Sequence, residues 1–142
     1  MESNFKWFQN KLRSPYLDSI LSQISSIDNI LHPVAFHSRS LSQAEANYTI
    51  YDKELLAIIT AFDVWRHHLE GAKFPVQVIT DHKNLLYFKK PQHLNQRQIR
   101  WSLFLSKLDF RISYRPGAKG VNLTLYQEGQ ITKQNTHLIS VL

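Results

Sequence analysis

Three segments in the middle of the chain decide the fold: Tyr51–Ile58 (YDKELLAI), Val78–Leu85 (VITDHKNL) and Ile112–Gly117 (ISYRPG). The first places an acid, Glu54, in an amphipathic helical pattern. The second places another, Asp81, directly after an apolar strand, where α/β folds present ligand-binding groups. The third alternates as a strand does and ends in a tight turn. Together they predict an α/β domain with two carboxylates brought close to each other.

A long helix is predicted around the first segment. Ser42 and Glu45 have the spacing of a capping box, which satisfies free backbone groups at a helix start. Gly71 stands where a helix is expected to end. Between these signals, apolar residues recur at spacings of three and four, as on the buried side of a helix: Tyr51, Leu55, Ile58, Phe62, Trp65 and Leu69.

Strands are predicted over 32–38, 74–80 and 110–114, and shorter helices over 81–88 and 95–108. In the first of these strands Val34 and Phe36 face one way, and Ala35 and His37 face the other. In the second, Pro75 has no backbone N–H to donate. Either this strand lies at an edge of the sheet, or Pro75 is its first residue. This order of elements predicts a mixed sheet packed by helices.

The two ends of the chain are harder to interpret. In residues 1–31, eight apolar residues can line one side of a helix: Trp7, Phe8, Leu12, Tyr16, Leu17, Ile20, Leu21 and Ile24. Ser14-Pro15 interrupts that pattern, and residues 22–29 resemble a hairpin or loop. We divide the chain into a divergent N-terminal segment (1–31), a central domain (32–120) and a divergent, largely polar tail (121–142).

Composition restricts the function. The net charge is +6 and the isoelectric point is about 9.7, which is typical of a protein with a polyanionic partner such as nucleic acid. There is no cysteine, no apolar run long enough to cross a bilayer and no signal-peptide pattern. We expect an intracellular protein, cytoplasmic or nuclear and not secreted, with no membrane partner. The oligomeric state is left open.

Glu54 and Asp81 are the candidate catalytic and metal-binding residues. Two carboxylates brought together can share Mg²⁺, which prefers oxygen ligands. The alternative is that Glu54 is a solvated helix acid beside Lys53 and Asp81 caps the turn that follows. The histidines match no standard ligand spacing.

Further runs extend the pattern: PVAFHSR (33–39), YTIYDKELLAI (48–58), WRH (65–67), TDHKNL (80–85), LNQRQ (94–98), RW (100–101), DF (109–110) and YRPG (114–117). With these runs in this order, the chain resembles the RNase H domain of Ty3/gypsy-type retrotransposon reverse transcriptases. The resemblance implies an RNase H-like fold, with a mixed central sheet flanked by helices. It also implies Mg²⁺-dependent hydrolysis of the RNA strand in RNA–DNA hybrids by four acids.

Only Glu54 and Asp81 match the acids that the resemblance implies. Lys11 falls near the position of the first-strand aspartate, and Thr124 stands in place of the last one. The first strand is therefore expected to be altered or replaced, for example by residues 4–12, or its place covered by a helix. Any Mg²⁺ would be weakly bound.

Basic residues on and beside the second and third predicted helices are candidates for contacts with the phosphates of a hybrid: Lys83, Lys89, Lys90, Arg97 and Arg100. The alternative is a solvated surface. Two functional classes follow. One is a retrotransposon RNase H-like endonuclease, a hydrolase. The other is a pseudoenzyme that binds nucleic acid or protein without cleavage, or a pseudogene product.

Overall fold

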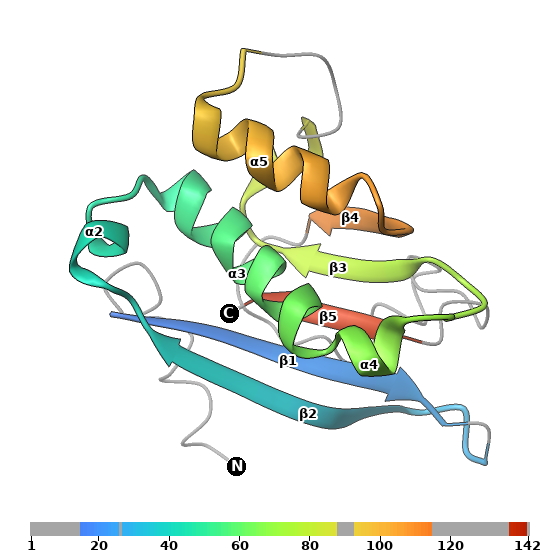
Figure 1. Cartoon of the computed structure of the whole chain (residues 1–142). Helices are drawn as coiled ribbons and strands as arrows, with labels where there is room; N and C mark the ends of the chain where they lie inside the picture. The colour runs from blue at the N-terminus through green and yellow to red at the C-terminus, as the bar shows by residue number, and fades with distance from the viewer. Residues whose placement is uncertain (1–14, 26, 88–92, 115–136, 142) are drawn as a thin grey trace.

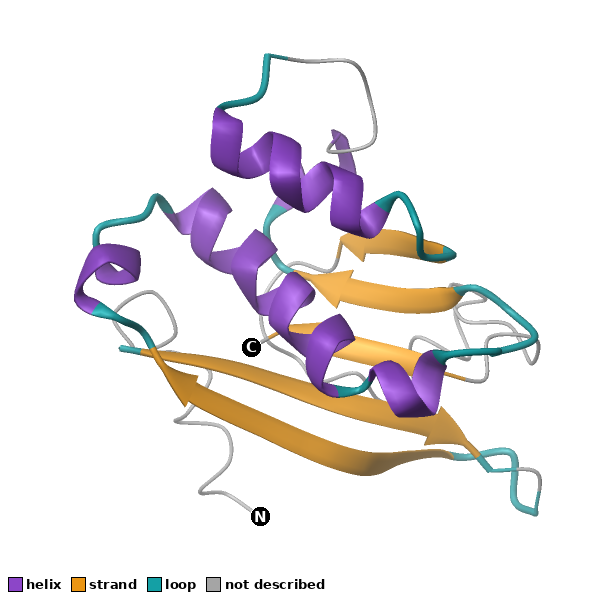
Figure 2. Cartoon of the chain, viewed as in Figure 1, coloured by secondary structure: helices purple, strands orange, loops and turns teal. Residues whose placement is uncertain are grey.

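The computed structural model describes residues 15–25, 27–87, 93–114 and 137–141. They form a five-stranded sheet with helices across one face (Figures 1 and 2). The strands are β1 (Tyr16–Ile24), β2 (Leu31–Ser40), β3 (Val76–Thr80), β4 (Phe110–Tyr114) and β5 (His137–Val141). The helices are α2 (Gln43–Ala46), α3 (Ile50–Val64), α4 (Arg66–Leu69), the 3₁₀ helix η2 (Lys83–Tyr87) and α5 (Gln96–Leu105).

The sheet is mixed and has the strand order β2-β1-β5-β3-β4. β1 runs antiparallel to both β2 and β5, whereas β3 runs parallel to both β5 and β4. The predicted α/β fold with a mixed central sheet flanked by helices is therefore confirmed. β3 lies inside the sheet, and Pro75 immediately precedes it, so the proline removes no hydrogen bond from the strand.

The central position of the sheet is filled by the last strand of the chain. β5 pairs with β1 from Ser19↔Val141 to Gln23↔His137, and with β3 from Gln77↔Leu138 to Ile79↔Ser140. The expectation that residues 4–12, or a helix, would fill this place is wrong, because residues 137–141 occupy it. Residues 4–12 themselves lie outside the described part of the chain. The polar tail thus contributes the strand that joins the two halves of the sheet.

Residues 16–24 form a strand, so the helix considered there is wrong. β1 pairs with β2 from Tyr16↔Ser40 to Ile24↔Leu31, with a register shift between Leu21 and Ser22, and the Ser25 N–H donates a hydrogen bond to the Ile30 carbonyl just beyond the paired residues. The apolar positions Leu17 and Leu21 fit one face of a strand as well as a helix, and sheet pairing selects the strand. The division drawn at residue 31 falls inside this hairpin.

The predicted capping box is present. The Ser42 hydroxyl accepts a hydrogen bond from the Glu45 backbone N–H at 3.2 Å, and the Glu45 carboxylate accepts one from the Ser42 N–H at 2.9 Å. The prediction of one long helix is wrong in two places: the capping box begins the short helix α2, α3 begins after its own N-cap Thr49, and a break at Trp65 separates α3 from α4. Gly71 follows α4 with a φ of 76°. A positive φ favours glycine, which explains why the helical segment ends there.

Glu45 also forms an ion pair with Arg39 at the end of β2, with 2.8 Å between Nη1 and Oε2. The hydrogen bond from Arg39 lowers the pKa of the Glu45 carboxyl. A lowered pKa in the folded state means that the pair stabilises the fold above the unfolded-state pKa, and that this contribution is lost as the pH falls through the folded-state pKa.

Glu45→Gln tests this pair, because glutamine keeps the capping box and removes only the charge. At about pH 7 the variant is expected to lose under about 1 kcal/mol of unfolding free energy, since the pair is partly solvated. At a pH below the folded-state pKa the difference from the parent chain is expected to vanish, because Glu45 is then protonated in both states. Urea unfolding at the two pH values measures it, and an equal loss at both would contradict the ion-pair explanation.

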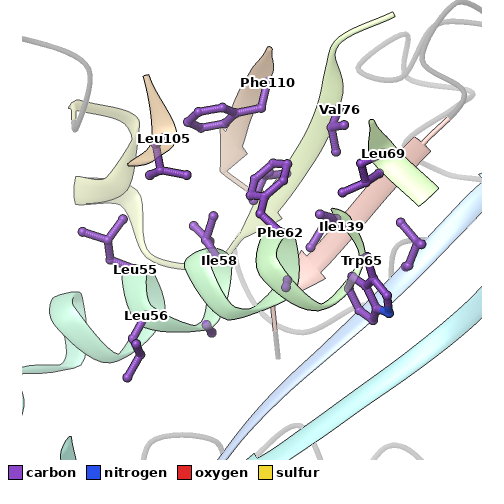
Figure 3. Packing of buried hydrophobic residues seen from close by; sticks show 14 of the residues in the cluster. Leu55, Leu56, Ile58, Phe62, Trp65, Leu69, Val76, Leu105, Phe110 and Ile139 are labelled. Carbon is purple, nitrogen blue, oxygen red and sulfur yellow. The ribbon is translucent and has the colours of Figure 1, made fainter. Parts of the chain in front are cut away.

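The core lies between α3 and the sheet (Figure 3). Leu55, Ile58 and Phe62 project from α3 and are at most 2% exposed. They meet Phe110 of β4 and Ile139 of β5, and the Phe62 and Phe110 rings lie 5.4 Å apart. The buried stripe predicted for the helix is therefore confirmed for this stretch, and it fixes α3 across the strand that fills the sheet centre.

The strand predicted for 32–38 is confirmed, but its alternation holds only from Val34 onward, since residues 32–34 are all exposed, and its bulky apolar residues point away from the core. Val34 is 48% and Phe36 72% exposed, while Ala35 packs against the core.

Among the described residues, no helix is both long and apolar enough to span a membrane.

Candidate functional site at the carboxyl end of β3

Glu54 and Asp81 converge on the carboxyl end of β3. Glu54 lies on α3 and is only 7% exposed, so the alternative of a solvated helix acid is wrong. Its Oε2 accepts a hydrogen bond from the Thr80 hydroxyl over 3.5 Å. Thr80 is the last residue of β3, and the exposed Asp81 follows it directly. The Thr80 hydroxyl therefore links the buried glutamate to the strand end that carries the aspartate.

Thr80 also shapes the backbone after the strand. Its hydroxyl accepts a hydrogen bond from the His82 N–H at 3.1 Å, which turns the chain out of β3 and toward η2. The His82 ring packs edge-on against Tyr51 of α3, with 5.6 Å between ring centroids. Two contacts between α3 and the end of β3 thus hold this edge of the sheet in place.

The register places a second strand end at the same edge. Because β3 and β5 are parallel and paired through Ile79↔Ser140, their carboxyl ends lie side by side. Because β1 is antiparallel to β5, the amino end of β1 lies there too. Asp18 of β1 is 8% exposed. Sequence analysis did not single it out, since one acid in an apolar run carries no motif.

The donor set of this edge suits a hard cation. Carboxylate and hydroxyl oxygens are the ligands that Mg²⁺ prefers, and it usually keeps several waters. Within residues 15–25, 27–87, 93–114 and 137–141, no cluster of three or more histidine, cysteine, aspartate or glutamate side chains is arranged to hold a metal ion. Glu54 and Asp81 are the carboxylates predicted as Mg²⁺ ligands; Glu54 contacts Thr80 at the carboxyl end of β3, and Asp81 directly follows that strand.

The candidate phosphate-binding residues differ in their surroundings. Lys83 on η2 and Arg100 on α5 are exposed. Lys89 and Lys90 lie outside the described residues. Arg97, on the first turn of α5, pairs with a buried residue of α3.

Arg97 joins α5 to the start of α3. Its Nη2 donates a hydrogen bond to Asp52 Oδ2 at 2.7 Å, and the Asp52 side chain is 4% exposed. Gln98 Nε2 donates to the other Asp52 oxygen at 2.8 Å. The hydrogen bond to Asp52 raises the pKa of Arg97. Asp52 therefore has both oxygens occupied by consecutive residues of α5.

Two aromatic rings complete this cluster. The Arg97 guanidinium lies 3.7 Å from the centroid of the Tyr48 ring and 5.6 Å from that of Trp101. The two rings themselves pack edge to face, with centroids 6.2 Å apart. A cation held over aromatic faces in this way is stabilised electrostatically. We call Tyr48, Asp52, Arg97, Gln98 and Trp101 the α3–α5 clamp.

Sequence analysis assigned Arg97 to phosphate binding and did not identify Asp52 as its partner. The available signal was the capping pattern: Asp52 stands three residues after the N-cap Thr49, and its N–H donates to the Thr49 hydroxyl at 3.2 Å. Gln98 stands three residues after Asn95 in the same way. Neither pattern indicates that the two helix starts meet, since residues far apart in sequence are brought together only by the fold.

Comparisons with known proteins agree with this architecture. Residues 14–108 match the family described as the RNase H-like domain found in reverse transcriptase. The chain is 41% identical over 102 residues, 70% of its length, to the Transposon Tf2-3 and Tf2-4 polyproteins of Schizosaccharomyces pombe. The match covers only 8% of each polyprotein. No solved structure matches significantly.

The matched region begins just before β1 and ends just after α5, so it includes both Glu54 and Asp81. It does not include β5, which supplies the centre of the sheet. The chain belongs to the family of RNase H-like domains of reverse transcriptases, of the kind carried by Ty3/gypsy-type retrotransposon polyproteins.

Proposed function

We propose that this domain binds RNA–DNA hybrids through the edge of the sheet at Asp81 and the adjoining exposed side of α5, and that it does not cleave them efficiently by itself. The observation that carries the proposal is the Glu54–Thr80 contact beside Asp81, which keeps two of the family's acids at one strand end. The basic net charge of +6 favours a polyanionic partner. Exposed Lys83 and Arg100 offer charges for phosphate contacts.

Glu54 and Asp81 would hold Mg²⁺ at this edge. When bound, such an ion neutralises phosphate charge and lowers the pKa of bound water. The chain's own contribution is to present Glu54 from a buried helix position and Asp81 from an exposed strand end. Efficient phosphodiester hydrolysis commonly uses two ions about 3.5–4 Å apart, and two carboxylates are too few to hold both.

The second candidate is a functional endonuclease of the same family. The buried placement of Glu54 beside the end of β3 favours it, since that placement is what a metal-dependent hydrolase needs. Against it stand Lys11 and Thr124 at the positions where the resemblance places the other acids. The strand that fills the sheet centre, β5 (HLISV), carries no acid that could replace the first one. A protein-binding role, or a pseudogene product with no selected role, is a further alternative.

One experiment separates these functions. A labelled RNA–DNA hybrid is mixed with the purified domain in Mg²⁺ and in Mn²⁺, and both binding and cleavage are followed. We expect binding that weakens as salt rises, with no cleavage above the level seen with Glu54→Gln and Asp81→Asn. Cleavage that either substitution abolishes would establish the endonuclease and overturn the non-cleaving proposal.

Substitutions on the proposed binding surface test which residues contact the hybrid. Lys83→Gln and Arg100→Gln are each expected to weaken hybrid binding and to reduce the slope of log K against log salt by about 1. Lys73→Gln is the matched control and is expected to leave both unchanged, because the exposed Lys73 precedes β3 and so lies at the opposite end of that strand from Asp81. No hybrid binding by a folded domain would leave the protein-binding alternative.

A further inference from the structure

The strand that completes the sheet comes from the far end of the chain. β1 and β5 are paired neighbours in space, yet they are the first and last strands in sequence. The β1–β2 hairpin and the β3–α5–β4 segment can each form from nearby residues, whereas β5 has to return past β4 and β3. Contacts between distant segments form late, because loop-closure entropy must be overcome first. The gap between β1 and β3, the β5 slot, is therefore the last part of the sheet to close.

β5 is held by backbone pairing on both sides and by one buried side chain. Five residue pairs join it to β1 and three join it to β3. Backbone hydrogen bonds of this kind do not depend on which copy of the chain supplies the strand. Ile139 adds an apolar anchor, with no exposed surface.

Several buried polar atoms around the β5 slot lack hydrogen-bond partners among the described residues. Ser19 and Ser140 are 2% and 4% exposed, and their hydroxyls have no hydrogen-bond partner within the described part of the chain. The same holds for Oδ1 of Asp18. A buried polar group without a partner destabilises the arrangement that contains it. These atoms lie on the two strands β1 and β5, so their cost opposes closure of the slot.

The connection between β4 and β5 is long enough to reach another molecule. Residues 115–136 separate the two strands, and a segment of that length can extend over about 70 Å. A domain of this size has a radius of gyration of about 15 Å. A copy can therefore place its β5 in the slot of a neighbour while its other elements stay folded.

We propose that the β5 slot accepts β5 from a second copy of this chain, so that two copies refolded together at high concentration form a strand-exchanged dimer. Such exchange adds no new type of contact and replaces each intramolecular pairing by the same pairing between copies. A tethered strand competes at an effective concentration of about 1 mM. Exchange is therefore expected to rise as total protein approaches that value.

The absence of cysteine from the sequence allows a direct test. Ile20 and Ser140 are opposite each other in the antiparallel β1–β5 ladder, where Cα atoms lie about 4.5–5.5 Å apart, within disulfide range. An Ile20→Cys copy and a Ser140→Cys copy are unfolded together, refolded over about 10 μM to about 1 mM, and then oxidised. We expect a cross-linked heterodimer whose yield rises with concentration.

Three controls define the result. Each single-cysteine variant is oxidised alone to give the background, and Gln23→Cys replaces Ile20→Cys as an exposed position on the same strand that does not oppose Ser140. The double variant Ile20→Cys/Ser140→Cys reports the pairing within one copy. If the double variant forms its disulfide while the mixed single variants never rise above background, the proposal is overturned.

A second test uses the unmodified chain, so its result does not depend on whether the cysteine variants fold. After refolding at the same concentrations, light scattering is expected to show a species of twice the 16.7 kDa chain mass. That species should persist on dilution and revert to monomer only after renewed unfolding, because exchange requires β5 to leave the sheet. A monomer at every concentration would overturn the proposal.

Discussion

Ile139→Ala is expected to lower the free energy of unfolding by about 2–5 kcal/mol, because it empties a fully buried site at the centre of the sheet. Ile139 is opposite Leu21 on β1 and Val78 on β3, and all three belong to the same core cluster. The cavity would lie where the two halves of the sheet meet. Chemical denaturation followed by circular dichroism measures the loss.

The matched control is Ile99→Ala on α5, where the side chain is 46% exposed. That change is expected to alter stability by no more than about 0.5 kcal/mol. Ile139→Asp is expected to prevent folding, because it would bury a charge in the core without a partner. If Ile139→Ala proves as mild as the control, β5 does not occupy the centre of the sheet.

Asp52→Ala is expected to cost about 2–4 kcal/mol. Removing one member of a buried ion pair usually costs about 3–5 kcal/mol, and the Arg97 side chain is 31% exposed, which reduces the penalty. The substitution leaves the Arg97 guanidinium and the Gln98 amide without their acceptor, and it loosens the attachment of α5 to α3. Urea unfolding measures the stability loss.

Asp63→Ala is the control for Asp52→Ala, because it removes the acid of an exposed ion pair. The Asp63–Arg66 pair has 3.5 Å between its atoms and side chains 68% and 59% exposed, so its removal is expected to cost at most about 0.5 kcal/mol. A double-mutant cycle of Asp52→Ala with Arg97→Ala is expected to give a coupling energy of about 1–3 kcal/mol. Strict additivity of the two substitutions would show that Asp52 and Arg97 do not stabilise each other.

Local signals predicted the elements that are defined by neighbouring residues. The Ser42–Glu45 capping box and the buried stripe of α3 were read directly from the sequence and are confirmed. Both depend on spacings of three and four residues, which the helix itself enforces. The strand and turn around Asp81 were found for a similar reason, because an apolar run followed by a polar turn is a local pattern.

Residues 16–24 show where local pattern is ambiguous. Leu17 and Leu21 are four residues apart, which suits a helix, and they also occupy alternate positions of a strand. The choice between the two depends on whether β2 and β5 are present to pair with the backbone. β5 itself was missed because five residues after a polar stretch carry too little hydrophobic pattern to predict a central strand.

The sequence by itself determined the family, the capping box at Ser42 and Glu45 and the buried stripe of α3, because each is carried by short runs or fixed local spacings; it also supplied Glu54 and Asp81 as predicted metal ligands. Only the tertiary structure decided that the last strand fills the centre of the sheet, that Glu54 is buried against Thr80, and that Arg97 pairs with Asp52. Those features join residues that lie far apart in sequence. Their energies depend on burial and geometry, which no local spacing encodes.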